Sequence, residues 1–184
     1  TQGLPAHITA ATGIDAMVHA IEAYTSKIKK NFYADMLAKQ ALKLLHKNLN
    51  LVLKDGSNLE ARQNMLLGSM LAGQAFANAP VGAVHALAYP LGGHFHLSHG
   101  HSNALVLLEV MKFNTPNAKQ YYAELMQCIH PFSQGSVDGL CDLFIDHLQQ
   151  HVQDSGLTLK LKELNIPEQH LEILAQDAMQ QTRL

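Results

Sequence analysis

Apolar residues recur with the spacing of an α-helix in almost every segment of this chain, and this periodicity is the feature that most constrains its fold. The stretch 9–24, for example, places Ile14, Met17, Val18 and Ile21 in one apolar stripe. Side chains three and four positions apart share a helix face, whereas a half-buried strand alternates apolar and polar residues with a period of two. No stretch of the sequence shows that strict alternation. The pattern therefore predicts an all-α fold of roughly eight or nine helices.

Turn and capping residues indicate where these helices begin and end. Thr9 and Thr12 are candidate N-caps of the first helix, and Ser57-Asn58-Leu59-Glu60 matches the S-x-x-E capping box of the third. Glycine density over residues 92–100 favours a loop, and Pro116 favours a break between two further helices. The helices that we expect cover about residues 9–24, 32–52, 57–78, 81–91, 102–113, 119–129, 137–152 and 168–179.

The composition favours one globular domain spanning residues 1–184, since 47% of the residues are hydrophobic. Thirteen Lys and Arg against 15 Asp and Glu give a formal net charge of −2, which argues against nucleic acid or an anionic membrane as a partner. No apolar run approaches the roughly 18 residues of a transmembrane helix, and residues 1–5 lack the features of a secretory signal. We therefore expect a cytoplasmic protein, with Cys128 and Cys141 as reduced thiols.

Histidine is the unusual part of the composition, because five of the 12 histidines fall between positions 85 and 101. Asp15 and His19 are four residues apart on the first predicted helix, so they project from the same face and both can reach one cation. His85 lies in a run of Val, Ala and Leu, where a buried imidazole needs a hydrogen bond or a metal. Taken singly, each of these features is more often an ordinary hydrogen bond than a metal site.

The four residues Asp15, His19, His85 and His99 would together supply one carboxylate oxygen and three imidazole nitrogens. That donor set suits Fe(II) or Zn(II). It contains no thiolate, and it has too few oxygens for calcium or magnesium.

These candidate ligands occur within two recognisable motifs. Residues 12–24 read TGIDAMVHAIEAY, and residues 73–79 read GQAFANA, followed by Val84-His85 and by HGHSNA at residues 99–104. The first segment resembles the motif TGxDAxxHAxEAY of the group III, iron-containing alcohol dehydrogenases. The second is similar to the next motif of that family, with its two histidines fourteen positions apart as in the family. The resemblance covers essentially the whole chain and is strongest over residues 4–114.

This resemblance implies a multi-helix domain of the dehydroquinate synthase-like type, without the N-terminal α/β nucleotide-binding domain of the family. No unit of strand, glycine-rich loop and helix occurs in the sequence, so we expect a C-terminal metal-binding domain that is a fragment of the enzyme. The resemblance also implies that Asp15, His19, His85 and His99 bind a catalytic divalent metal, Fe(2+) with Zn(2+) as the alternative. Such a metal polarises the oxygen of a small alcohol or aldehyde while hydride passes to or from NAD or NADP, which the missing domain mainly binds.

Two further site residues follow from the resemblance. Phe76 aligns with an aromatic residue near the nicotinamide, although ordinary helix core explains it equally well. Tyr89 stands where many relatives have a histidine assigned to proton relay, and it is our candidate catalytic residue. The resemblance assigns no role to His94, His96 or His101, for which a polar, partly exposed loop is a simpler interpretation than a second structural metal site.

Two alternatives stay open on the sequence alone. A glycerol dehydrogenase-like enzyme shares this type of domain but typically binds zinc through three protein ligands, and the pair Asp15 and His19 argues against it. A helical module that binds metal or forms oligomers without catalysis is the other alternative. We expect the isolated chain to be inactive, because nothing in it can hold a pyrophosphate. The substrate, the choice between NAD and NADP, and a homo-oligomeric assembly remain open.

Overall fold

The computed structural model describes residues 1–181, which form seven α-helices and two short 3₁₀ turns and contain no strand. The helices are α1 (Ala6–Thr25), α2 (Phe32–Lys54), α3 (Leu59–Asn78), α4 (Ala83–Phe95), α5 (His99–Ile129), α6 (Val137–Asp154) and α7 (Leu171–Met179). The 3₁₀ turns η1 (Leu161–Leu164) and η2 (Glu168–His170) lie between α6 and α7. The predicted all-α fold is thereby confirmed. None of these helices is long and apolar enough to cross a membrane.

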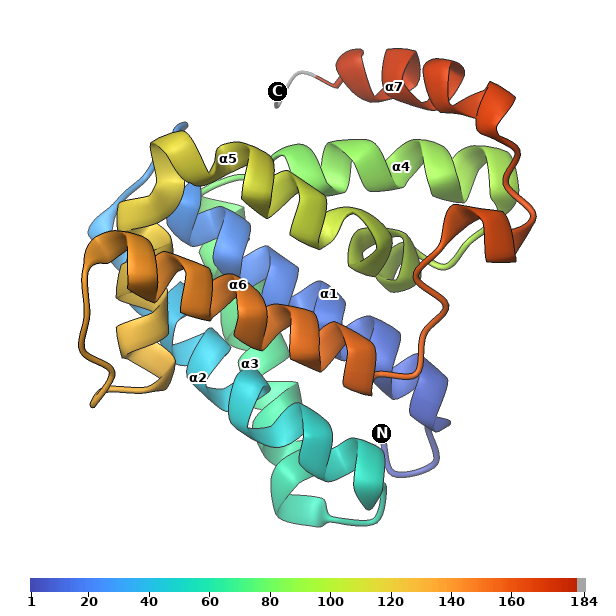
Figure 1. Cartoon of the computed structure of the whole chain (residues 1–184). Helices are drawn as coiled ribbons and strands as arrows, with labels where there is room; N and C mark the ends of the chain where they lie inside the picture. The colour runs from blue at the N-terminus through green and yellow to red at the C-terminus, as the bar shows by residue number, and fades with distance from the viewer. Residues whose placement is uncertain (182–184) are drawn as a thin grey trace.

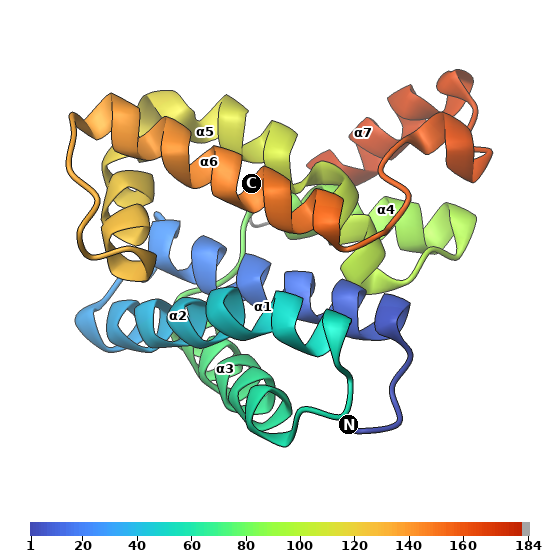
Figure 2. The ribbon, with the colours of Figure 1, turned by 60° about the horizontal axis from the view of Figure 1, so that its bottom comes forward.

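The helices form two layers that enclose α1. In one layer α2 and α3 pack against each other and against α1, and α5 covers α1 from the other side with α6 beside it. Figure 2 shows α5 and α6 above α1 and α2, with α4 and α7 together at one end (Figure 2). Because α1 is covered on two sides, its predicted stripe of Ile14, Met17, Val18 and Ile21 is at most 2% exposed.

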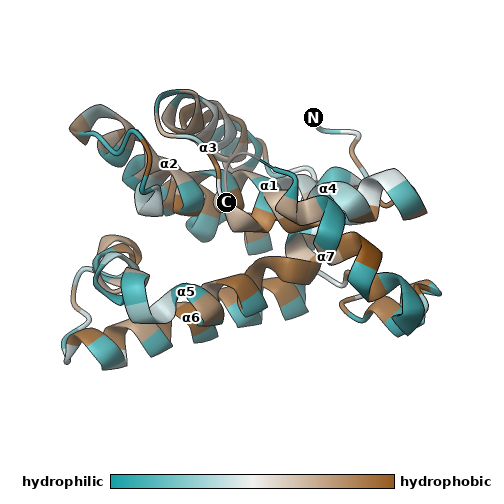
Figure 3. Cartoon of the chain, turned by 90° about the horizontal axis from the view of Figure 1, so that it is seen from above, coloured by the Kyte–Doolittle hydropathy of each residue, from teal (hydrophilic) through white to brown (hydrophobic). Residues whose placement is uncertain are grey.

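The hydrophobic core lies between the two layers. Figure 3 shows α5 and α6 with apolar segments turned toward α1 to α3 and polar segments turned away (Figure 3). In α6 the buried side chains of Leu140, Phe144 and Leu148 are four residues apart, whereas Asp142 and Asp146 are exposed. This spacing is that of an amphipathic helix with one face on the core.

Helix α4 is longer than the sequence predicted. It continues through Gly92 and Gly93 to Phe95 and ends where His96 adopts the left-handed conformation with φ of 55°. The loop expected over residues 92–100 is therefore reduced to three residues between α4 and α5. Glycine weakens a helix only by about 1 kcal/mol, and packing of α4 against α5 and α7 offsets that cost.

The two helices that we expected on either side of Pro116 are one bent helix, α5. Figure 1 shows the bend where its colour turns from yellow to gold (Figure 1). A proline removes one N–H donor and clashes with the preceding turn, which bends a helix without necessarily ending it. Met111 and Ala118 on either side of Pro116 are buried, so core packing holds both halves of α5 in place.

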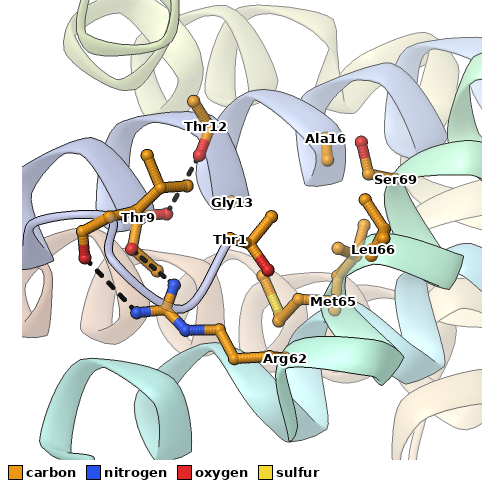
Figure 4. Close-up of a pocket in the computed structure, with 11 residues that line it drawn as sticks. Thr1, Thr9, Thr12, Gly13, Ala16, Arg62, Met65, Leu66 and Ser69 are labelled. Atoms are coloured by element: carbon orange, nitrogen blue, oxygen red, sulfur yellow. Dashed lines mark hydrogen bonds between the residues drawn. The ribbon is translucent and has the colours of Figure 1, made fainter. Parts of the chain in front are cut away.

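The N-caps predicted for α1 are wrong. The helix begins at Ala6, so Thr9 and Thr12 lie inside its first turns. Figure 4 shows the guanidinium of Arg62 on α3 pointing to Thr9, whose Oγ1 accepts a hydrogen bond at 2.8 Å (Figure 4). Thr12 Oγ1 donates to the carbonyl oxygen of Ile8 at 2.8 Å. Thr9 therefore bonds to a neighbouring helix and Thr12 to its own helix, and neither caps α1.

The capping residue of α3 lies one position later than predicted. Asn58 Oδ1 accepts a hydrogen bond from the backbone N–H of Ala61 at 3.0 Å, which is the N-cap interaction. Ser57 Oγ instead donates to Asp55 Oδ1 at 2.6 Å within the preceding turn. The start of α3 was therefore predicted closely, but the predicted capping box is wrong.

Candidate metal centre

Four side chains from three helices converge beside the middle of α1. Asp15, His19, His85 and His99 each offer one ligand atom, and these atoms all lie within 4.8 Å of one another. The Nε2 atoms of His19, His85 and His99 lie 3.8, 3.6 and 3.5 Å from Asp15 Oδ1. The carboxylate is thus the common neighbour of the three imidazoles.

The local structure of three helices explains this convergence. Asp15 and His19 are one turn apart on α1, His85 lies in the first turn of α4, and His99 is the first residue of α5. The start of α5 approaches α1 so closely that a Cβ on Gly100 would lie 2.2 Å from the carbonyl oxygen of Ala11. Glycine therefore permits the contact that carries His99 to the centre.

The centre is buried on one side and open on the other. The side chain of His85 is 1% exposed, and those of Asp15 and His19 are each 19% exposed. His99 is 44% exposed and marks the open side. The ring of His85 stacks on that of His19 with centroids 4.6 Å apart and lies 5.2 Å from that of His99.

Glu22 supports this centre, and the sequence analysis missed it. It is 6% exposed, and its Oε2 accepts a hydrogen bond from His85 Nδ1 at 2.6 Å. Its Oε1 accepts another from the backbone N–H of Val84 at 2.7 Å. With Nδ1 protonated, His85 Nε2 keeps its lone pair on the side of Asp15. The sequence did contain one signal for Glu22, because Asp15, His19 and Glu22 have the spacing i, i+4, i+7 that places three side chains on one helix face.

Asn103 is the second supporting residue that the sequence analysis missed. Its Nδ2 donates to Asp15 Oδ1 at 2.5 Å and lies 3.4 and 3.3 Å from the Nε2 atoms of His85 and His99. Its Oδ1 is buried and has no hydrogen-bond partner. Through its Nδ2, the amide holds the carboxylate of Asp15 between the imidazoles.

The electrostatics of the centre put Asp15 and His19 in the protonation states that bind metal and leave a proton on His85 to be displaced. Burial would raise the pKa of Asp15, but the imidazoles of His85, His19 and His99 and the hydrogen bond from Asn103 lower it, so the carboxylate is ionised. Burial lowers the pKa of His19, and the charge of Asp15 only partly opposes this, so the ring is neutral. Burial would also lower the pKa of His85, but the carboxylates of Asp15 and Glu22 raise it. When His85 is doubly protonated, its second proton lies on Nε2, and a cation bound here displaces that proton.

Phe76 and Tyr89, the two other predicted site residues, border the centre. The ring of Phe76 on α3 is half-buried, and its centroid lies 4.5 Å from that of His19. The ring of Tyr89 on α4 stacks at 5.7 Å on that of His99 and is 38% exposed. Both aromatic residues therefore line the approach to the centre.

The remaining histidines of the 85–101 segment do not belong to this cluster. His94 Nε2 lies 2.6 Å from Asp177 Oδ2 on α7. His101 Nε2 donates to the carbonyl oxygen of Thr158 at 2.6 Å. His96 ends α4. These contacts link α4 and α5 to the C-terminal segment.

A small cavity of about 110 Å³ between α1 and α3 is separate from the centre. Figure 4 shows the side chains that line it (Figure 4). They include Thr9, Thr12, Gly13, Ala16, Arg62, Met65 and Ser69. None of the four converging residues borders it.

Comparison with known proteins agrees with the motif resemblance. The sequence model of the Fe-containing alcohol dehydrogenase family, C-terminal, matches residues 9–184. Long-chain-alcohol dehydrogenase 1 of Geobacillus thermodenitrificans (strain NG80-2) is 41% identical over 188 residues, which cover 100% of this chain and 47% of that relative.

Solved structures extend the comparison to the fold. The crystal structure of a 1,3-propanediol oxidoreductase superposes with a TM-score of 0.95 at 36% identity, covering 100% of this chain and 48% of that one. Sulfoacetaldehyde reductase from Bifidobacterium kashiwanohense, solved in complex with NAD+, superposes with a TM-score of 0.87 at 29% identity, covering 100% and 46%. The chain spans about half the length of the relatives that it matches. It belongs to the Fe-containing alcohol dehydrogenase family and corresponds to the C-terminal helical domain of that family.

Proposed function

We propose that this chain is the metal-binding half of an NAD(P)-dependent alcohol dehydrogenase and that Asp15, His19, His85 and His99 hold Fe(2+). The observation that carries the proposal is the convergence of these four side chains, whose ligand atoms lie within 4.8 Å of one another. One carboxylate and three imidazoles suit Fe(2+), and the family is iron-containing. When bound, the metal supplies Lewis-acid polarisation of an alcohol or aldehyde oxygen.

The chain itself positions the ligands and shapes the approach to them. Glu22 keeps the lone pair of His85 Nε2 directed at the site, and Asn103 holds Asp15 by a hydrogen bond. The exposed side at His99 is where substrate would enter, and Tyr89 beside it is the candidate to move the hydroxyl proton. Phe76, whose ring lies beside His19, would provide an apolar wall for the nicotinamide ring.

We further propose that NAD or NADP is bound mainly by a domain outside these residues. The chain spans about half the length of its relatives, and a related reductase is solved with NAD+. The chain should therefore show no turnover alone with any alcohol and either nucleotide. The substrate class that we propose is a small alcohol or aldehyde, which accords with the long-chain alcohols and 1,3-propanediol in the names of two relatives.

The decisive experiment measures iron and turnover together in the full-length protein. His85→Ala should lower the iron content and the alcohol-dependent reduction of nicotinamide in parallel, because it removes a buried ligand. His96→Asn is the matched control, since asparagine tolerates the left-handed backbone at that position. A His85→Ala protein that retained its iron and turned over like the control would refute the assignment.

A further inference from the structure

A second group of four histidines lies at the other end of α5, away from the candidate metal centre. His46 comes from α2, His130 directly follows α5, and His147 and His151 are one turn apart on α6. The ring centroid of His46 lies 5.2, 6.1 and 4.6 Å from those of His130, His147 and His151. The centroids of His130 and His147 are 4.9 Å apart. Four imidazoles from α2, from α6 and from the residue that follows α5 thus form one contiguous cluster.

The spacing of these rings matches that of the imidazoles in the candidate metal centre. There the three centroid separations are 4.6, 5.2 and 6.5 Å. In the second cluster the four separations run from 4.6 to 6.1 Å. His147 and His151 also have the i, i+4 spacing with which two side chains on one helix reach a single cation. Among the described residues, only Asp15, His19, His85 and His99 already have their ligand atoms gathered for a metal, so the second cluster must turn its rings to surround one.

The polar atoms of the cluster are incompletely satisfied. His151 is 7% exposed, and its buried Nδ1 has no hydrogen-bond partner. A buried ring nitrogen without a partner is costly unless something binds it. His147 Nδ1 donates to the carbonyl oxygen of Leu143 at 2.9 Å, which leaves its Nε2 free to act as a ligand. His130 is exposed and borders, with His147, an opening of about 380 Å³ through which an ion could enter.

The chemistry of the cluster selects among cations. The four members of the cluster offer imidazole nitrogens and no carboxylate or thiolate. A set of neutral nitrogen donors suits zinc, copper or nickel and does not suit magnesium or calcium, which prefer oxygen.

We propose that His46, His130, His147 and His151 form a second metal site that binds a divalent cation of the zinc type through imidazole nitrogens. The rings now meet largely edge to face, and rotation about the soft Cβ–Cγ bonds turns their nitrogens toward a shared point. Bound metal ties α2 and α6 to the end of α5. The site is independent of the catalytic proposal, because it shares no residue with the candidate metal centre.

Zinc titration of the full-length protein tests this site. The background is the double variant Asp15→Ala/His85→Ala, which removes two of the four ligands of the first centre. Adding His130→Gln and His147→Gln, which change two side chains at the surface opening, should remove one bound zinc equivalent. Zinc should also raise the melting temperature of the background protein but not that of the cluster variant, because a ligand stabilises only the state that binds it. Adding His7→Gln, an exposed histidine outside the cluster, should change neither result.

Crystals of the unaltered protein soaked in zinc give a readout that does not depend on the variants. An anomalous peak within about 2.0–2.2 Å of at least three of the four imidazoles is expected. Equal zinc content in the cluster variant and the His7→Gln control would overturn the proposal, and so would the absence of that peak. Neither result would bear on iron binding by Asp15, His19, His85 and His99.

Discussion

Glu22 and His85 are joined by a buried hydrogen bond of 2.6 Å between residues 63 positions apart in the chain. His85 Nδ1 donates to Glu22 Oε2, and the other oxygen of Glu22 accepts from the N–H of Val84. The carboxylate therefore holds both the imidazole and the start of α4. It sets which nitrogen of His85 carries the proton, and so which nitrogen faces Asp15.

Glu22→Gln should lower iron affinity by roughly 10- to 100-fold while the fold is kept. The amide oxygen can still accept from Val84, but the amide N–H₂ would face His85 Nδ1 and favour the proton on Nε2, the nitrogen that would bind metal. Anaerobic Fe(2+) titration of the full-length protein measures the effect. Glu109→Gln on α5, whose side chain is 78% exposed, is the control and should bind iron normally. Equal affinity of the two variants would contradict this role of Glu22.

Gly100→Ala should destabilise the protein by about 3 kcal/mol, at the upper end of the usual cost of overpacking. The new Cβ would meet the backbone of Ala11, which cannot move aside, so α5 must shift and carry His99 with it. Gly73→Ala inside α3 is the matched control, since a Cβ there meets nothing within 4 Å. The control should gain roughly 0.5–1 kcal/mol from helix propensity. Urea unfolding compares the two, and similar midpoints would show that the approach of α5 to α1 is not tight.

Tyr89→Phe should reduce kcat of the full-length enzyme by about 100-fold and leave its iron content unchanged. The substitution removes the hydroxyl and keeps the ring that stacks on His99. Tyr89→His should restore part of the activity and change its pH profile, because an imidazole can also relay a proton near neutral pH. Turnover of Tyr89→Phe within two-fold of the parent would assign the proton transfer to another group or to water.

The free energy of unfolding should fall as the pH drops below about 6.5, in part because of His46. Its pKa is about 3 in the folded chain against 6.5 for a free imidazole, so the unfolded state takes up the proton first. The contribution of His46 is complete above pH 6.5 and is lost progressively as the pH falls toward 3. Replacing His46 by Gln should therefore flatten this part of the profile, by at most about 1.4 kcal/mol for each pH unit. Urea unfolding with a chelator present measures the slope, and a slope equal to that of the parent would contradict the lowered pKa.

The periodic positions of apolar residues were enough to predict the fold class and the bodies of the helices. Helix propensity, capping and the spacing of three to four residues are local properties, so they can be read along the chain. The same reasoning placed Asp15 and His19 on one face of α1, and two motifs identified the family. The errors lay at boundaries: Gly92, Gly93 and Pro116 weaken a helix locally, but the packing of α4 and α5 in the fold outweighs them.

Tertiary structure decided what surrounds the candidate ligands. Glu22 carried a weak signal in its helical spacing, but nothing local pairs it with His85 or places Asn103 beside Asp15. The second histidine cluster joins positions 46, 130, 147 and 151, and only the pair on α6 has a recognisable spacing. The physical reason is that burial and hydrogen bonding depend on which distant segments meet. The packing of whole helices decides which segments come into contact. A single residue type indicates only whether its own side chain prefers to be buried or exposed.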